Sequence, residues 1–204
     1  MTETGRRLLP YGPSGWLVEV DDGDVLGYAA AARGGPDVDE AVPAATTVLV
    51  RLRHGADRVA VADWLGGLAP VDAGSFDAAN AVELDVVYDG ADLHHVASAT
   101  GLTVDEVVDL HAAGRYTCAF CGFAPGFGYL AGLDERLNLP RRSTPRTNVP
   151  LGAVAIAAGY SAVYPSPSPG GWHLLGRTDA DVWDPRRPQP ALLRPGTTVR
   201  FTPR

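Results

Sequence analysis

Residues 122–152 read GFAPGFGYLAGLDERLNLPRRSTPRTNVPLG, and this stretch decides how the second half of the chain folds. Glycine and proline interrupt regular structure, so the stretch predicts neither a long helix nor an ordinary strand. It also carries charged and aromatic side chains that look exposed (Arg136, Arg141, Arg142 and Arg146; Phe123, Phe127 and Tyr129). The stretch therefore indicates a loop-rich fold whose loops carry the chemistry.

The remainder of the second half has the same character. From residue 115 onward no convincing long helix occurs, and short apolar runs such as AVAIAAG, SAVYP and TVRFTP are separated by Gly/Pro turns. Many short strands joined by turns are typical of a closed or nearly closed β-barrel. We therefore predict a barrel domain over residues 89–204.

The first half has longer periodic segments. They predict three strands and two helices in the order β-α-β-α-β (15–20, 24–35, 46–53, 56–68 and 81–89). We place this small α/β layer at residues 1–88, which makes the fold class α+β. Two short helices are expected at the start of the barrel domain, at 90–101 and 103–114, and the second opens with the Thr103 and Glu106 spacing of a capping box.

The composition excludes several classes of protein. A hydrophobic content of 46% with 20% charged residues is typical of a folded globular chain, and no apolar run approaches the roughly 20 residues of a membrane helix. The N-terminal MTETGRRLLPYGPSG lacks the basic-then-apolar order of a secretion signal, so we expect a cytoplasmic protein. The net charge of −7 and the lack of a recognition motif argue against nucleic acid as a partner.

Charge is unevenly distributed along the chain. Residues 1–112 hold 19 acidic residues and six arginines, whereas residues 113–204 hold five acidic residues and 11 arginines. This asymmetry indicates that the second half faces an anion or an acidic partner. The alternative is that the two halves neutralise each other across an internal interface.

Cysteine and histidine form no recognisable metal or redox site in the sequence. Cys118 and Cys121 have C-x-x-C spacing, but on a strand residues three apart point to opposite faces, so we interpret them as two small buried residues. His94 and His95 lack a third ligand at metal spacing, and His111 lies near a helix C-terminus, where a cation is mildly favoured. We expect no bound metal. The signatures of a P-loop, a nucleophile elbow and a zinc protease are missing.

A second Gly/Pro-rich stretch, YPSPSPGGWHLLGRT at 164–178, complements the first. Consecutive glycines allow backbone N–H groups to converge on an anion, and arginine offers a fixed fork that matches carboxylate or phosphate. Prolines keep such loops stiff, which lowers the cost of ordering them on binding. The two stretches predict a rigid anion pocket on the barrel rim. Barrel turns whose arginines form surface ion pairs remain the equal alternative.

The two stretches share an ordered set of motifs with a known family. The motifs are F-x-P-G-F-x-Y-L, L-D, P-R-R-x-x-P-R-x-x-V-P-x-G and Y-P-x-x-S-P-G-G-W-x-L-x-G-R-T, which run from Phe123 to Thr178. The chain resembles the B-type subunit of the ATP-dependent 5-oxoprolinase complex, a family also called allophanate hydrolase subunit 1 that includes the sporulation kinase inhibitor KipI. It is similar as well to subdomains C and D of the carboxyltransferase part of urea carboxylase.

The resemblance implies a fold and an activity. The second half would be a cyclophilin-like closed barrel, and the protein would be one subunit of an enzyme that opens 5-oxoproline to glutamate with ATP and its magnesium ion. It would be inactive by itself and would act with a C-type subunit, which is a related barrel protein, and an A-type subunit, which is an amidohydrolase-like chain. Two alternatives remain open: a binding module that inhibits a histidine kinase, and a carboxyltransferase or allophanate hydrolase component of urea breakdown.

The resemblance and the chemistry together suggest roles for individual residues. We expect catalytic donors that stabilise the charge of a transferring phosphoryl group at Arg142, Arg146 and Arg177, and a histidine that positions substrate or moves a proton at His173. The expected substrate-binding residues are the aromatic walls and the glycine backbone of the two stretches (Phe127, Tyr129, Trp172, Gly170 and Gly171).

The chain departs from the family pattern at two places that flank the predicted pocket. Tyr160 and Ser161 stand where the family often has Gln-Thr, and His173 stands where it often has Gln. A histidine donor can replace a glutamine donor, but both departures bear on which substrate is bound.

Overall fold

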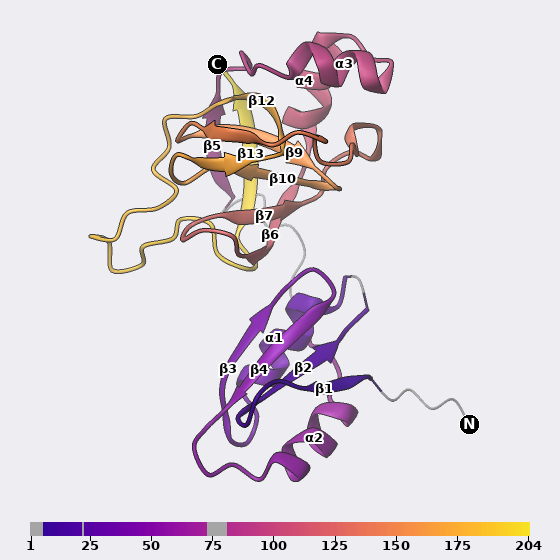
Figure 1. The fold of residues 1–204 in the computed structure, drawn as a ribbon, viewed down its shortest axis with the longest axis vertical. Helices are drawn as coiled ribbons and strands as arrows, with labels where there is room; N and C mark the ends of the chain where they lie inside the picture. The colour runs from indigo at the N-terminus through magenta and orange to yellow at the C-terminus, as the bar shows by residue number, and fades with distance from the viewer. Residues whose placement is uncertain (1–5, 22, 73–80) are drawn as a thin grey trace. The chain divides into compact units, whose positions relative to one another are not determined.

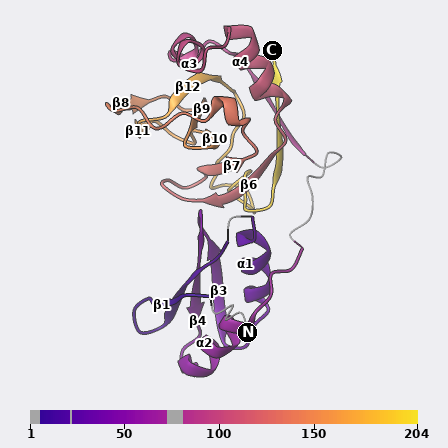
Figure 2. The same cartoon turned by 90° about the vertical axis from the view of Figure 1, so that its right-hand side faces the viewer.

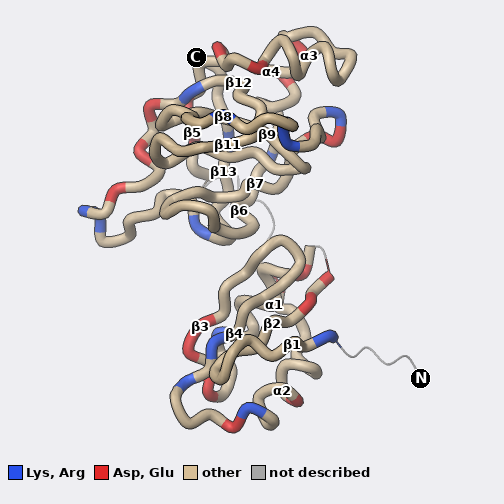
Figure 3. The backbone as a smooth tube through the Cα atoms, viewed as in Figure 1, with Lys and Arg blue, Asp and Glu red and all other residues tan. Residues whose placement is uncertain are grey.

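The computed structural model describes residues 6–21, 23–72 and 81–204, which form two compact units. The first unit is Met1–Ser75 and the second is Phe76–Arg204, and each has its own hydrophobic core (Figure 1). Figure 3 shows acidic and basic positions in both units. Within the described ranges, no helix is both long enough and apolar enough to cross a membrane.

The first unit is an antiparallel four-stranded sheet in the order β1-β2-β4-β3, packed with two helices. Its elements are β1 (Leu8–Pro10), β2 (Gly15–Glu19), α1 (Val25–Arg33), β3 (Val38–Pro43), β4 (Thr47–Leu52) and α2 (Arg58–Gly67). The alternation of TVLVRL in β4 buries Val48, Val50 and Leu52 on one face. The Asp57 carboxylate accepts hydrogen bonds from two backbone N–H groups and begins α2.

The second unit is a seven-stranded sheet in the order β12-β9-β10-β7-β6-β13-β5. All neighbours are antiparallel except β13 and β5. The strands are β5 (Val82–Val86), β6 (Tyr116–Cys121), β7 (Gly128–Ala131), β9 (Ala153–Ala157), β10 (Tyr160–Val163), β12 (His173–Arg177) and β13 (Thr198–Pro203). A separate two-stranded ribbon pairs β8 (Arg146–Val149) with β11 (Ser168–Gly170) and projects beside β9 and β12 (Figure 2).

The two end strands of this sheet meet, which brings it close to a closed barrel. Val87, just after β5, exchanges two backbone hydrogen bonds of 2.9 Å with Arg177 at the end of β12. Gly176 makes this seam possible because a Cβ at that position would overlap the Val87 carbonyl oxygen. The predicted α+β class, a small layer followed by a barrel, is confirmed.

Two helices lie at one end of the barrel in both views (Figures 1 and 2), and a short 3-10 turn contacts both of them. They are α3 (Leu93–Thr100), α4 (Val104–Ala113) and η1 (Glu135–Leu137). The predicted capping box is present, since the Thr103 hydroxyl accepts from the Glu106 N–H and the Glu106 carboxylate accepts from the Thr103 N–H. The apolar faces of α3 and α4 pack over β9 and β12.

The boundary and strand set of the first unit differ from the sequence expectation. The strand predicted at 81–89 belongs to the barrel and not to the N-terminal layer, because β5 pairs in parallel with β13 within the unit Phe76–Arg204. Neither β1 nor β3 was predicted. β1 is only three residues long, and β3 (VDEAVP) mixes acidic residues with a proline, so both have weak strand patterns.

The expectation that Cys118 and Cys121 point to opposite faces is wrong. The register between β6 and β7 shifts at Cys118 and Phe120, and this bulge adds one residue to the strand. The two sulfur atoms therefore lie 3.9 Å apart. Cys118 is buried and Cys121 is half-buried, and both are free thiols.

Candidate functional site

The site is organised by a loop that sequence reasoning did not single out, residues 87–92 between β5 and α3. Its backbone lies along β12, with hydrogen bonds from Gly90 N to Leu175 O and from Asp92 N to Leu174 O, both 3.0 Å. This pairing fixes the Asp92 backbone to the barrel wall and leaves its side chain only 3% exposed.

Asp92 binds two of the predicted arginines. Its Oδ1 accepts hydrogen bonds from Arg142 Nη1 at 2.6 Å and from Arg146 Nη2 at 2.7 Å, while Oδ2 accepts from the Leu174 N–H at 2.8 Å. Burial favours the neutral carboxyl, but the Arg146 and Leu174 hydrogen bonds and both guanidinium charges outweigh it and lower the Asp92 pKa. Asp92 is therefore an ionised carboxylate at neutral pH.

The Asp92 cluster has a net positive charge. Two guanidinium groups share one carboxylate oxygen, which leaves one unit of positive charge at the cluster formed by Asp92, Arg142 and Arg146. Arg142 Nε and Arg146 Nη1 are buried and have no acceptor among the described residues, and the two side chains remain 31% and 24% exposed. Buried N–H groups without acceptors are costly, so this arrangement favours an added acceptor.

A small aromatic cavity adjoins the arginine cluster. It has a volume of about 80 Å³, and its lining combines rings, glycines and one arginine (Phe123, Phe127, Tyr129, Arg141, Tyr164, Pro169, Gly170, Gly171 and Trp172). The Phe127 and Trp172 rings meet edge to face, with centroids 5.5 Å apart. All five predicted substrate-binding residues therefore line one cavity.

Three aromatic side chains of the first stretch were predicted to be exposed, and the structure confirms this for one of them. Phe123 is 62% exposed, whereas Phe127 is buried and Tyr129 is half-buried. Phe123 also has a φ of 68°, in the left-handed region that a bulky residue rarely adopts.

The glycine pair joins the cavity to the arginine cluster. Gly170 on β11 lies opposite Arg146 on β8, and the Arg142 N–H donates to the Gly171 carbonyl at 2.8 Å. Gly170 has no space for a Cβ, because the Tyr164 hydroxyl packs against it. Burial raises the Tyr164 pKa, and the nearby charges of Arg141 and Arg146 oppose that rise.

His173 lies on β12 beside Leu174, whose N–H binds Asp92. Its Nε2 lies 2.9 Å from the Pro140 carbonyl oxygen, which has no proton to give, so Nε2 is the donor. In neutral His173 this leaves Nδ1 as an acceptor, and Nδ1 is buried without a partner among the described residues. The ring stacks on that of His95, with centroids 5.5 Å apart.

Arg177 is not brought into the Asp92 cluster. It lies at the other end of β12 from His173, at the barrel seam, and its Nε donates to Asp89 at 2.9 Å. Both side chains are about half exposed (55% and 48%). The predicted set of three arginines thus divides into a pair on Asp92 and a single surface ion pair, because the 87–92 loop offers two carboxylates at different positions along β12.

His111, which the sequence left without a clear role, is fully buried in the barrel. Its Nδ1 lies 2.8 Å from the Tyr88 hydroxyl and its Nε2 lies 2.8 Å from the Ser161 hydroxyl. Burial lowers the His111 pKa to about 3, so the ring is neutral. Ser161 is also buried, which makes this network a structural element rather than a nucleophile and its base.

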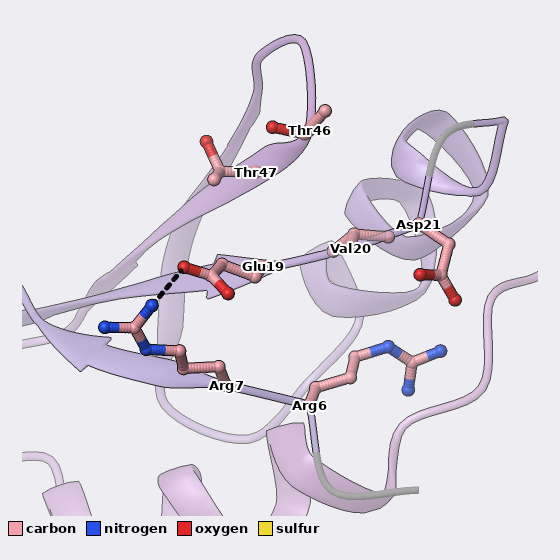
Figure 4. A pocket seen from close by; sticks show the side chains of 7 residues that line it. All are labelled: Arg6, Arg7, Glu19, Val20, Asp21, Thr46 and Thr47. Carbon is pink, nitrogen blue, oxygen red and sulfur yellow. Dashed lines mark hydrogen bonds and ion pairs between the residues drawn. The ribbon is translucent and has the colours of Figure 1, made fainter.

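A larger hollow of about 590 Å³ lies in the first unit (Figure 4). Its two arginines already have partners, since Arg7 pairs with Glu19 at 3.1 Å and Arg6 donates to the Leu68 carbonyl. Within the described ranges no group of three or more potential ligands is placed to hold a metal ion. The barrel site is therefore the stronger candidate.

Asp92 is the functional residue that sequence reasoning missed. Asp92 lies inside the helix predicted at 90–101, whereas in the structure α3 begins at Leu93 and the Asp92 carboxylate makes no capping hydrogen bond.

The curated proteins to which this chain is similar include B subunits of 5-oxoprolinase from different bacteria. The chain is 49% identical over 125 residues to the B subunit of 5-oxoprolinase from Escherichia coli O157:H7, which covers 60% of this chain and 57% of that protein. It is 43% identical over 123 residues to the B subunit of 5-oxoprolinase from Bacillus subtilis (strain 168), which covers 59% of this chain and 51% of that protein. The matched part thus spans only about half the length of these curated relatives.

Solved structures agree on the fold. The crystal structure of TTHA0988 superposes with a TM-score of 0.79 at 37% identity, over 93% of this chain and 40% of that one. Urea amidolyase of K. lactis superposes with a TM-score of 0.76 at 16% identity, over 100% of this chain and 15% of that one, which shows a shared fold alone. The model of the carboxyltransferase domain, subdomains C and D, matches residues 7–193, and the chain belongs to this family.

Proposed function

We propose that this protein is the B-type subunit of an ATP-dependent 5-oxoprolinase, which opens the lactam of 5-oxoproline to give glutamate. The observation that carries the proposal is the Arg142–Arg146 pair held on Asp92 beside the aromatic cavity. Relatives named as the B subunit of 5-oxoprolinase support the same assignment. The substrate is a small ring with one carboxylate, and the site offers cationic donors next to apolar walls.

The chemistry explains why such a site needs fixed donors. A lactam carbonyl is a poor electrophile at neutral pH, and ATP supplies a phosphoryl group that activates the carbonyl oxygen. One 5-oxoproline, one ATP and two waters become one glutamate, one ADP and one phosphate. In this scheme Arg142 and Arg146 hold and stabilise negative charge, the aromatic walls exclude water, and His173 Nδ1 accepts a proton or a ligand N–H.

The described cavity does not fit a nucleotide in this chain alone. Its 80 Å³ is far below the roughly 300 Å³ or more of ordinary small-molecule sites, and the sequence has no phosphate-binding loop. The proposal therefore places the nucleotide and its magnesium ion largely on partner subunits. The protein is then inactive by itself and works in the cytoplasm with the C-type subunit, a related barrel protein, and the A-type subunit, an amidohydrolase-like chain.

One observation also favours a second function. Phe123 and Leu151 are 62% and 56% exposed, and Phe123 has an unusual backbone conformation for a surface aromatic. Exposed large apolar side chains of this kind serve as anchors in protein interfaces. They suit docking to partner subunits, and they suit equally a binding module that inhibits a histidine kinase.

The test is reconstitution. The protein is co-expressed with its A-type and C-type partners, and 5-oxoproline-dependent release of ADP and glutamate is measured, with each polypeptide omitted in turn. The proposal expects turnover only when all three are present. Urea-dependent activity with a biotin-containing partner would support the carboxyltransferase alternative, and inhibition of a purified sensor kinase would support the binding module. Absence of 5-oxoproline turnover in the complete assembly would contradict the proposal.

A further inference from the structure

The Asp92 cluster has a charge that limits what it binds. One carboxylate faces two guanidinium groups, each of which makes a single hydrogen bond to it. Arg141, on the rim of the cavity, adds further positive potential near Tyr164. The excess of one unit at the cluster is balanced by one singly charged anion, whereas a polyphosphate carries several times that charge.

The geometry of the cluster suits a carboxylate. Guanidinium groups present planar N–H edges that match the two oxygens of a carboxylate, and here two such groups converge on one point. The neighbouring cavity is small and walled by Phe127, Tyr129 and Trp172. A ligand with one carboxylate on a compact ring matches both parts of the site, because its carboxylate fits the two guanidinium groups and its ring fits the small aromatic cavity.

We propose that Asp92 is a positioning residue that holds Arg142 and Arg146 as a paired donor for the single carboxylate of the ligand. The choice of 5-oxoproline as that ligand rests on the proposed function. Asp92 performs this role without touching the ligand, because its own oxygens are occupied by the two arginines and by the Leu174 N–H.

The attachment of Asp92 to the barrel supports a positioning role. Its N–H donates to the Leu174 carbonyl at 3.0 Å, and its Oδ2 accepts from the Leu174 N–H at 2.8 Å. Asp92 is thereby tied to β12 at two points, one through its backbone and one through Oδ2, and both arginines bind Oδ1. Long arginine side chains lose much conformational freedom in this arrangement before any ligand arrives, which lowers the cost of binding.

Substitution of Asp92 by asparagine separates positioning from simple charge. Asp92→Asn raises the local charge from one positive unit to two, so attraction by charge alone predicts tighter binding of an anion. If Asp92 instead holds the two arginines in position, the same substitution releases them, and the anion binds more weakly. The two explanations thus give opposite signs for one measurement.

The experiment is calorimetric titration of this chain, alone and in the complex, with 5-oxoproline and with 2-pyrrolidinone, which has the same ring without the carboxylate. We expect the wild-type chain to bind 5-oxoproline at least tenfold more tightly than 2-pyrrolidinone, and Asp92→Asn to lose most of this preference. Asp92→Glu is expected to restore part of it. Asp184→Asn is the matched control, because Asp184 also binds two arginines, Arg186 and Arg187, both of them neighbours within its own loop.

A second variant guards against misfolding of Asp92→Asn. Arg142→Gln leaves Asp92 paired with Arg146 and brings the cluster to neutrality, so the fold is retained and carboxylate preference is expected to fall at least tenfold. Equal or tighter binding of 5-oxoproline by Asp92→Asn overturns the inference, and so does a wild-type chain that does not distinguish the two ligands.

The kinetics distinguish failure of the inference from failure of the proposed function. In the complex, Asp92→Asn is expected to raise the KM for 5-oxoproline at least tenfold and to change kcat much less. Turnover with an unchanged KM in Asp92→Asn contradicts the inference while the function stands. Selective binding of 5-oxoproline without any turnover in the wild-type complex supports the inference and contradicts the function.

Discussion

Asp92 and Asp184 each bind two arginines, but their surroundings differ. The Asp92 side chain is 3% exposed and its arginines are one-quarter to one-third exposed, whereas the Asp184 side chain is 13% exposed and its arginines are 85% and 38% exposed. The arginines that bind Asp92 are about 50 positions away in the sequence, whereas those that bind Asp184 are two and three positions away. The first cluster joins separate parts of the barrel and the second only shapes its own loop.

This difference shows why counting arginines does not locate a site. An exposed ion pair contributes little because water screens it, whereas a buried carboxylate must be fully satisfied and fixes the groups around it. The Asp92 cluster holds cationic donors in place next to a cavity. The Asp184 cluster has no neighbouring cavity among those described.

The largest expected difference between the clusters is in activity. Arg146→Gln is expected to lower kcat/KM for 5-oxoproline-dependent ATP hydrolysis in the complex at least tenfold, because the ligand carboxylate loses one of its two charged donors. Arg186→Gln, the control in the exposed cluster, is expected to change the rate less than twofold. Equal effects of the two substitutions would remove the functional distinction between the clusters.

The activity assay also decides the role of Arg177. The resemblance predicted it to be catalytic, yet it pairs with Asp89 at the barrel seam. Arg177→Gln is expected to reduce turnover less than tenfold. A loss as large as that of Arg146→Gln would return Arg177 to the catalytic group and would require the site to extend along β12.

Stability gives the next contrast. Asp92→Asn is expected to lower the free energy of unfolding by about 2–4 kcal/mol, because two partly buried guanidinium groups lose their carboxylate. Asp184→Asn is expected to leave it unchanged within error. Urea denaturation followed by fluorescence measures both. A neutral result for Asp92→Asn would mean that solvent satisfies the arginines and that the cluster is not rigid.

The buried His111 network provides a pH test. The His111 pKa is lowered from 6.5 to about 3 by burial, so the folded protein binds fewer protons than the unfolded chain between these values. The stability that depends on neutral His111 is complete above pH 6.5 and is lost as the pH falls toward 3. The slope contributed is at most about 1.4 kcal/mol per pH unit.

His111→Gln removes that ionisation and is expected to flatten the pH dependence between pH 6.5 and 4, whatever its effect on absolute stability. Denaturation midpoints measured across this range in wild type and variant give the comparison. An identical slope in the two proteins would show that other groups govern acid unfolding.

The smallest expected effect is on the response to salt. Hydrogen bonds from the side chain and backbone of the largely exposed Arg186 lower the Asp184 pKa to about 2. High salt should move this pKa back toward its usual value, whereas the buried Asp92 should respond less. Carboxyl chemical shifts followed by NMR at low and high salt measure both residues. A larger shift for Asp92 would indicate that its cluster is open to solvent.

The sequence predicted the parts of the fold that depend on local pattern. The alternation in β4, the capping box of Thr103 and the short barrel strands are all local properties, and the structure has them. The placement of β5 was wrong because its partner, β13, lies over a hundred residues away. The opposite-face argument for Cys118 and Cys121 failed because a bulge changes the alternation that it assumed.

The candidate site was predicted in part for the same reason. Gly/Pro-rich loops identified the aromatic and glycine residues, which line one cavity. The pairing of Arg142 and Arg146 through Asp92 depends on contacts across 50 or more residues, which no local pattern encodes. The separate position of Arg177 likewise follows from closure of the barrel at Val87.

A crystal structure of the assembled complex with 5-oxoproline tests the role of Arg142 and Arg146 most directly. The ligand carboxylate is expected within hydrogen-bond distance of both Arg142 and Arg146, with Asp92 still bridging the two guanidinium groups and the ligand ring against Trp172. A ligand bound elsewhere, or arginines that leave Asp92 and turn to solvent when it binds, would contradict the central claim.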